Sequence, residues 1–94
     1  VSLFRVLDEH GVADAARVPS LTPQELVRIY RGMVLVRLMD ERLLALQRQG
    51  RIGFYGEARG QEAAVIGAAA ALGPEDWLVP ALRSPSALPI RWSG

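Results

Sequence analysis

The chain has 94 residues, of which 50% are hydrophobic, a formal net charge of +1 and no cysteine. This length allows one domain at most, since independent domains usually contain about 100–150 residues. The lack of cysteine excludes disulfides, thiolate metal ligands and a cysteine nucleophile, and the balanced charge argues against a protein that binds nucleic acid. The sequence has neither an apolar run of membrane-spanning length nor the pattern of a signal peptide, so we expect a cytoplasmic protein.

Residues 1–20 predict a loosely held arm with one helical turn near residues 13–16. The arm contains the only histidine, His10, beside Asp8 and Glu9. Catalysis by histidine needs a positioned partner and a pocket, and this polar segment indicates neither. We therefore expect His10 to be a solvated side chain.

A long helix is predicted from residue 23 to residue 49. The sequence Thr22-Pro23-Gln24-Glu25 is a capping box with proline at the first helical position, and Gly50 is the kind of residue that ends helices. Apolar residues then recur at helical spacing, at Leu26, Ile29, Met33, Val36 and Leu43, and Tyr30, Val34 and Leu38 widen the apolar stripe. The helix is too apolar for so short a chain, so we expect it to need a larger body or a partner as cover.

Charged residues in the second half of this helix predict a solvated face. Asp40 and Glu41 lie in a segment with Arg37, Arg42 and Arg48, and they are three and four positions from Arg37. Helix pairs at these spacings contribute a few tenths of a kcal/mol each. Met33 and Met39 fit a hydrophobic core better than a ligand site.

A loop and a second helix follow. Residues 51–60 contain glycines at 53, 56 and 60 around Phe54 and Tyr55, which predicts an exposed loop. Residues 61–72 predict a helix that Gly73-Pro74 ends. One face of it has small residues that would allow close approach of another element, namely Gly60, Ala64, Gly67 or Ala68, and Ala71.

The last segments have a different composition. Trp77-Leu78-Val79 predicts a short buried strand that leads to Pro80 and Arg83. From Ser84 onward two prolines and three serines interrupt any periodicity. No P-loop, Rossmann fingerprint, zinc-protease motif or nucleophile elbow is present, and the glycines at 53–60 have the wrong spacing for a phosphate loop. The residues alone therefore predict an α-rich fragment with an exposed loop of glycines and aromatic residues.

Several separated blocks nevertheless occur in a familiar order. They are Tyr30-Arg31-Gly32-Met33-Val34, Arg37-Leu38-Met39-Asp40-Glu41-Arg42, Gln49-Gly50-Arg51-Ile52-Gly53-Phe54-Tyr55, Gly60-Gln61-Glu62-Ala63-Ala64, Gly67 and Asp76-Trp77. Together they resemble the start of the α subunit of the 2-oxo acid dehydrogenase E1 component, the family of the pyruvate, branched-chain and acetoin dehydrogenases. The resemblance covers roughly residues 21–83.

The resemblance implies an oxidoreductase that uses thiamine diphosphate and Mg²⁺. In that family an E1 β subunit completes the cofactor site, a 2-oxo acid loses CO₂, and the acyl group passes to a lipoyl arm of E2. The cofactor supplies the carbanion chemistry, while the protein supplies orientation and charge. In the family the apolar helix and the small-residue face are buried in a larger α/β subunit, so the resemblance also accounts for both.

The resemblance assigns cofactor-binding positions but neither a catalytic residue nor a metal ligand to this chain. Arg83 falls on an arginine that contacts the diphosphate, and a guanidinium suits that task because it binds phosphate oxygens bidentately. Phe54 and Tyr55 match the aromatic loop near the cofactor. Leu82 replaces the family's tyrosine, which removes one hydroxyl contact. Gly56 stands where some pyruvate-specific members have histidine, so the 2-oxo acid stays open, pyruvate or branched-chain.

We therefore expect an α-rich fragment of an α/β thiamine-diphosphate-binding fold, with two main helices and one short strand. Residues 1–20 would be the arm, residues 21–83 the part of an E1 α domain, and residues 84–94 a tail that does not match the family, since the acidic residue and glycine expected after Arg83 and the Mg²⁺-binding segment are absent. Such a chain would be a truncated α subunit, inactive alone. The alternatives are a helical interaction module without enzymatic activity and a non-functional remnant.

Overall fold

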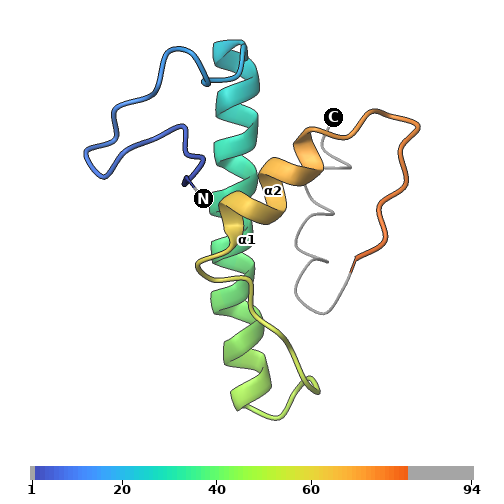
Figure 1. Ribbon diagram of the computed structural model, residues 1–94. Coiled ribbons are helices and arrows are strands. Elements are labelled where there is room, and N and C mark those ends of the chain that lie inside the picture. The colour runs from blue at the N-terminus through green and yellow to red at the C-terminus, as the bar shows by residue number, and fades with distance from the viewer. Residues whose placement is uncertain (1, 81–94) are drawn as a thin grey trace.

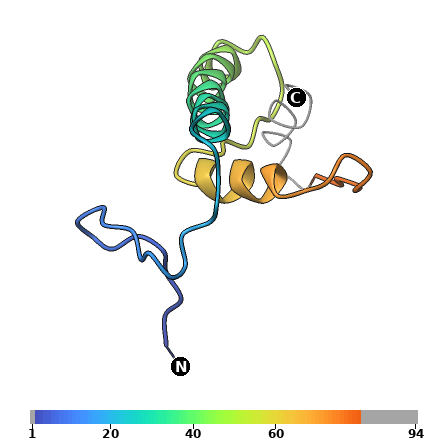
Figure 2. The same ribbon diagram turned by 90° about the horizontal axis from the view of Figure 1, so that it is seen from above.

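The structure, a computed structural model, describes residues 2–80 and contains two helices, α1 (Pro23–Arg48) and α2 (Glu62–Ala70). The short helix α2 lies across the middle of α1, and the loop that joins them runs back from the C-terminal end of α1 (Figures 1 and 2). Within residues 2–80 there is no strand, and the only β-type pairing is an isolated antiparallel bridge between Leu7 and Ala13. The two helices were predicted, to within two residues at each end.

The N-terminus of α1 has the predicted capping box. The amide of Glu25 donates to Oγ1 of Thr22 at 3.1 Å, and the amide of Thr22 donates to Oε1 of Glu25 at 3.4 Å. Thr22 is extended, with ψ 157°, and Pro23 occupies the first helical position. Two amides that have no carbonyl partner within the helix are thus hydrogen-bonded, which fixes where the helix begins.

The C-terminus of α1 ends at glycine, also as predicted. Gly50 has a φ of +70°, a left-handed conformation that strains residues with a Cβ. Its amide donates to the carbonyl of Gln47 at 3.0 Å, and the amide of Arg51 donates to the carbonyl of Leu46 at 3.0 Å. This is the Schellman arrangement, and it turns the chain back along α1.

One row of residues on α1 packs against one face of α2. The buried residues of α1 are spaced four apart, Gly32, Val36 and Asp40, and those of α2 are Glu62, Ile66 and Ala69. The hydrophobic core consists of Val36, Ala58, Ile66 and Ala69, with Ile29, Met33, Val65, Ala70 and Leu78 half-buried around it. Few apolar side chains therefore hold the two helices together.

Much of the remaining apolar surface of α1 is exposed. Six large apolar side chains lie more than a third exposed, namely Leu26, Val27, Tyr30, Val34, Leu35 and Leu38, and we call this surface the outer face of α1. The expected apolar excess of this helix is therefore present in the structure, and α2 covers only one side of it. No helix among residues 2–80 is long and apolar enough to cross a membrane.

The small-residue face of α2 does not pack tightly on α1. Ala64, Ala68 and Ala71 are exposed, and a Cβ added to Gly67 would meet nothing within 4 Å. The face that contacts α1 is the one with Ile66, because burial of a large side chain removes more apolar area from water than burial of alanines does. The expectation of a close contact at the small residues is not met by any described element.

The predicted strand at residues 77–79 is wrong. The segment is extended, but no neighbouring strand is present in residues 2–80 to pair with it, and a strand needs the hydrogen bonds of a partner. Leu78 packs against the core, whereas Trp77 is 90% exposed and Val79 is exposed as well. Helices are therefore the only regular secondary structure of residues 2–80, and the α/β fold remains an expectation.

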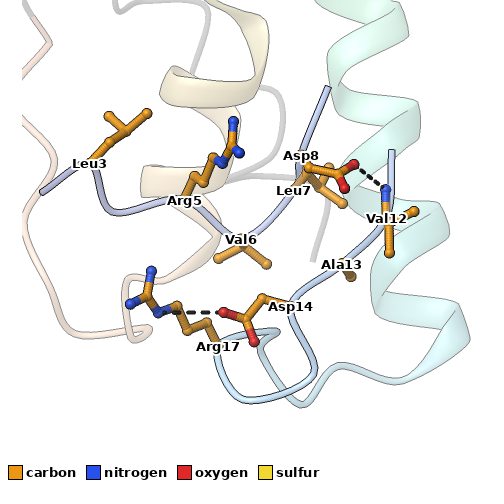
Figure 3. A pocket seen from close by; sticks show the side chains of 9 residues that line it. All are labelled: Leu3, Arg5, Val6, Leu7, Asp8, Val12, Ala13, Asp14 and Arg17. Carbon is orange, nitrogen blue, oxygen red and sulfur yellow. Dashed lines mark hydrogen bonds and ion pairs between the residues drawn. The ribbon is translucent and has the colours of Figure 1, made fainter. Parts of the chain in front are cut away.

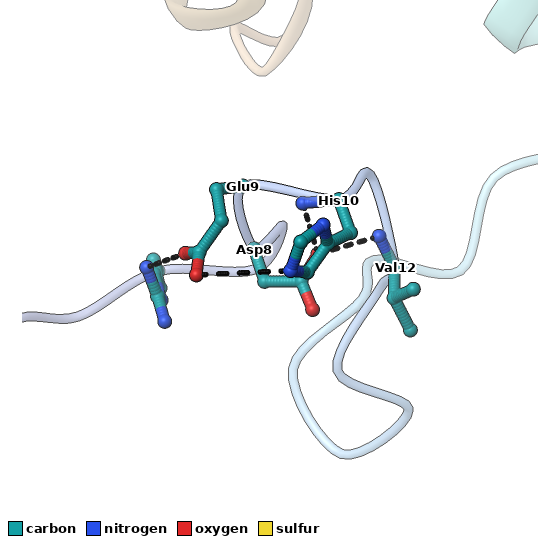
Figure 4. Close-up of polar contacts among 5 residues, drawn as sticks. Asp8, Glu9, His10 and Val12 are labelled. Atoms are coloured by element: carbon teal, nitrogen blue, oxygen red, sulfur yellow. Dashed lines mark hydrogen bonds and ion pairs between the residues drawn. The ribbon is translucent and has the colours of Figure 1, made fainter.

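The N-terminal arm is held by local contacts. The carboxylate of Asp8 accepts from the amides of His10 and Val12 at 2.9 and 2.8 Å (Figure 4), and the amides of Arg17 and Val18 donate to the carbonyl of Asp14. The last two bonds form a single turn, close to the predicted one. The side chain of His10 is exposed, as expected, and its Nε2 lies 3.9 Å from Glu9.

Candidate functional site

The main polar cluster of the described residues centres on Asp40, which is 1% exposed. Its Oδ1 accepts from the hydroxyl of Tyr55, and its Oδ2 accepts from the amide of Ala58 at 2.9 Å. The prediction that Asp40 lies on a solvated face of α1 is therefore wrong, although Glu41 is exposed as predicted. The reason is that both partners lie on the loop, 15 and 18 residues further along the chain. Spacing along a helix could not reveal them.

The environment of Tyr55 favours its neutral form. The pKa of the phenol is raised from 10.0 to about 12, most by burial, then by the hydrogen bond and the charge of Asp40, and least by the charge of Glu57. A phenol that donates to a carboxylate resists ionisation, since the phenolate would face a second negative charge. Tyr55 is therefore a hydrogen-bond donor over the whole physiological range of pH.

A third contact holds the same part of the loop. The amide of Tyr55 donates to Oε1 of Gln47 at 2.5 Å, so that both the backbone and the side chain of Tyr55 are bonded to α1. The preceding residue, Phe54, makes no such contact and is 78% exposed. The loop thus presents one aromatic side chain inward to α1 and its neighbour outward to solvent.

An ion pair joins the two helices next to this cluster. Nε and Nη2 of Arg37 both donate to Oε2 of Glu62, the former at 3.1 Å, and the amide of Gly60 donates to Oε1. The hydrogen bond from Arg37 lowers the pKa of Glu62, burial opposes that shift, and the backbone amides and the charge of Arg37 support it. Glu62 is therefore ionised at neutral pH, and its negative charge lies in the first turn of α2, where the helix dipole favours it.

Two open grooves lie along the contact between the helices. One, of about 450 Å³, contains the Arg37–Glu62 pair and is otherwise mostly apolar; it is lined by Tyr30, Met33, Val34, Arg37, Leu38, Gly60, Glu62 and Ala63. The other, of about 380 Å³, is apolar and lies between the start of α1 and the end of α2, with Leu26, Ile29, Gly67, Ala70 and Ala71 among its lining residues. Both grooves border the outer face of α1.

A third cavity, of about 330 Å³, lies within the N-terminal arm (Figure 3). Its walls are the two segments joined by the Leu7–Ala13 bridge, and Arg17 pairs with Asp14 across it at 3.6 Å. The charged residues that line it have partners within the arm. Arg5 pairs with Glu9, Arg17 pairs with Asp14, and Asp8 accepts from two backbone amides. This cavity therefore reflects how the arm folds on itself.

The predicted cofactor-binding residues are not gathered into one site. Phe54 and Tyr55 are neighbours on the loop but point to different surroundings, whereas Leu82 and Arg83 lie outside the described residues. Among residues 2–80 no group of three acidic or histidine side chains could hold a metal ion. The described residues thus do not fit a complete site for a diphosphate with its metal, because the polar groups of the cluster bind one another.

Comparison with known proteins identifies the family. The family described as "Dehydrogenase E1 component" matches residues 30–91. The pyruvate dehydrogenase E1 component subunit alpha of Staphylococcus aureus (strain Mu50 / ATCC 700699) is 42% identical over 82 residues, which are 86% of this chain and 22% of that protein. The subunit of the same name from Bacillus subtilis (strain 168) is 43% identical over 81 residues, 85% of this chain and 22% of that protein.

The chain belongs to the dehydrogenase E1 family. The resemblance inferred from the sequence blocks is thereby confirmed, and the chain is similar to α subunits of pyruvate dehydrogenase, an oxidoreductase family. It spans about a fifth of the length of the curated relatives it matches. The family match includes both helices' contact residues from Tyr30 onward and the whole 49–61 loop.

Sequence reasoning missed three residues of the polar cluster of this E1 family member. Asp40 and Arg37 were expected in contact with solvent, and Glu62 was noted only as part of a sequence block. One signal was available: a tyrosine within a glycine-rich loop and a glutamate directly after it need partners if the loop packs on a helix, because buried polar groups are hydrogen-bonded. The helix residues one turn apart, Arg37 and Asp40, are the charged groups that supply them.

Proposed function

We propose that this chain acts as part of an E1 α subunit in the thiamine-diphosphate- and Mg²⁺-dependent oxidative decarboxylation of a 2-oxo acid, pyruvate or a branched-chain one. The E1 β subunit would complete the site, and the acyl group would pass to lipoyl-E2. The observation that carries the proposal is the identity of 42–43% to pyruvate dehydrogenase E1 α subunits over 81–82 residues. Residues 21–83 would be the part that contributes to the enzyme.

The proposed contribution of this chain is structural support and cofactor contact. The 49–61 loop would lie near the cofactor with Phe54 exposed toward it, and Arg83 would bind the diphosphate. Thiamine diphosphate would supply the carbanion chemistry when bound with Mg²⁺. Among residues 2–80 no group of three acidic or histidine side chains could hold the metal, so its ligands would lie outside these residues.

Calorimetry with thiamine diphosphate and Mg²⁺ tests the proposal on the purified chain. We expect binding, and we expect Arg83→Ala to weaken it about tenfold or more, since a charge-assisted hydrogen bond contributes about 1.5–3 kcal/mol. Arg17→Ala is the matched control, because Arg17 pairs with Asp14 within the arm, and it should bind as the wild type does. Absence of binding by the wild-type chain would refute the proposed contact between this chain and the cofactor.

The chain alone should not catalyse the reaction. It spans 22% of the relatives' length, and the proposed metal ligands and β subunit are outside it. We expect no release of CO₂ from pyruvate by the purified chain with cofactor and Mg²⁺, in an assay where a complete E1 α2β2 enzyme is active. Release of CO₂ at a rate above that of the cofactor alone would contradict this.

The outer face of α1 favours a second candidate, a helical interaction module without enzymatic activity. Amphipathic helices bind partners through apolar residues at spacings of three, four and seven, and the exposed residues of α1 have such spacings. Sedimentation without cofactor separates the candidates. Stable self-association that Val34→Glu abolishes, together with no cofactor binding, would favour the interaction module. A chain without helical circular dichroism would favour a non-functional remnant.

A further inference from the structure

The 49–61 loop is bonded to α1 at three points on one side. Asp40 accepts from the Tyr55 hydroxyl and the Ala58 amide, and Gln47 accepts from the Tyr55 amide. The residues involved on α1 are seven positions apart, which is about two turns, so they lie on the same face of the helix. The bonds therefore run along the helix and hold both the middle and the end of the loop.

A fully buried carboxylate in so small a core needs an explanation. Burial of a charge is costly unless hydrogen bonds replace its water, and a hydrophobic residue of similar size would avoid that cost. Asp40 is 1% exposed, and each of its two oxygens accepts a bond from the loop. Its role is therefore to fix the loop in one register, because an apolar side chain would leave the Ala58 amide without an acceptor.

We infer that Asp40 is a positioning residue, which fixes the path of the 49–61 loop through the Tyr55 hydroxyl and the Ala58 amide, and that Tyr55 serves this contact instead of touching a ligand. The inference rests on the proposed function, because the ligand that Tyr55 would not touch is the proposed thiamine diphosphate. It removes Tyr55 from the expected cofactor contacts: its donor is already used, and its backbone is held by Gln47.

Amide hydrogen exchange measured by NMR at neutral pH tests the role of Asp40. We expect Asp40→Asn to speed exchange of the Ala58 amide about tenfold or more, since hydrogen bonds to charged groups contribute about 1.5–3 kcal/mol. Glu41→Gln is the matched control, because that neighbouring carboxylate is exposed, and it should leave the rate within about twofold. Equal Ala58 rates in the two variants would overturn the inference.

If Asp40→Asn fails to fold, exchange will also be faster at α1 amides such as that of Leu43. A second variant keeps the test decisive in that case. Tyr55→Phe keeps the ring and removes only the hydroxyl. We expect it to retain helical circular dichroism and to speed exchange of the residue 55 and Ala58 amides about threefold or more. Unchanged exchange at both amides would refute the positioning role.

Tyrosine absorbance at 295 nm gives an independent signature. The chain has two tyrosines, so Tyr30→Phe leaves Tyr55 as the only one. With a pKa of about 12, about 10% of Tyr55 is ionised at pH 11, and Asp40→Asn should at least double that fraction. Circular dichroism at pH 11 verifies that the helices persist. No change on substitution of Asp40 would show that the carboxylate does not face the phenol in solution.

Calorimetry separates this inference from the proposed function. If Tyr55 is a positioning residue, Tyr55→Phe should weaken thiamine diphosphate binding only together with faster loop exchange. Weaker binding with unchanged exchange would show that the hydroxyl touches the cofactor, and the inference would fail. If the wild-type chain binds no thiamine diphosphate, the proposed cofactor contact of this chain fails, whereas the exchange rates still decide the role of Asp40.

Discussion

Ile66 is the side chain on which the contact between the two helices most depends. It is 0% exposed, and among residues 2–80 its core contains only three other buried apolar residues. Ile66→Ala removes the three carbons beyond Cβ, worth about 2.4 kcal/mol at about 0.8 kcal/mol each, and leaves a cavity that raises the loss to about 3–4 kcal/mol. A chain of this length is stable by roughly 5 kcal/mol at the lower end of the usual range. The variant should therefore lose more than half of its free energy of unfolding.

Urea unfolding followed by circular dichroism at 222 nm measures this loss. With a slope of about 1 kcal/mol per molar urea, the midpoint should fall by about 3 M. The control is Val27→Ala on the outer face of α1, where the side chain is 54% exposed and the expected change is within about 0.5 kcal/mol. If Ile66→Ala does not fold, Ile66→Val should still lower the midpoint by about 1 M. Midpoints of the position 66 variants equal to that of Val27→Ala would refute this account of the core.

Three further outcomes are expected from the same measurement. Thr22→Ala should cost about 1 kcal/mol and Thr22→Ser little, because the serine hydroxyl keeps the bond to the helix amide. Gly50→Ala should cost about 1 kcal/mol for its positive φ, whereas Gly53→Ala, with open space around it and no positive φ, should cost nothing. Because the pKa of Glu62 is lowered from 4.5 in the folded state, its contribution is present above pH 4.5 and lost as pH falls through the lowered pKa; the urea midpoint of Glu62→Gln should therefore vary less between pH 6 and pH 3 than that of the wild type.

The helices were predictable because their signals are local. Thr22 and Glu25 are three residues apart, and Gly50 directly follows the last apolar turns, so the bonds that end α1 involve neighbours in sequence. The strand at 77–79 was predicted wrongly, because apolar β-type residues indicate only that a segment could pair with another strand. Whether it pairs depends on other strands, and none lies within residues 2–80.

The polar cluster was not predictable for a similar reason. The pairs Arg37–Glu62 and Asp40–Ala58 join residues 25 and 18 positions apart, and charge patterns on a helix can only suggest partners three or four positions away. The glycine spacing predicted the loop, but the family resemblance treated Phe54 and Tyr55 alike. Only the packing of the loop on α1 distinguishes the exposed ring from the bonded one.

The two bonds of Asp40 differ in how they respond to mutation. The bond to Tyr55 requires a hydroxyl, whereas the bond to residue 58 uses a backbone amide that every residue except proline has. A change at position 54 alters neither of them. A substitution at position 54 can therefore change the exposed side chain of the loop while the loop keeps its place on α1.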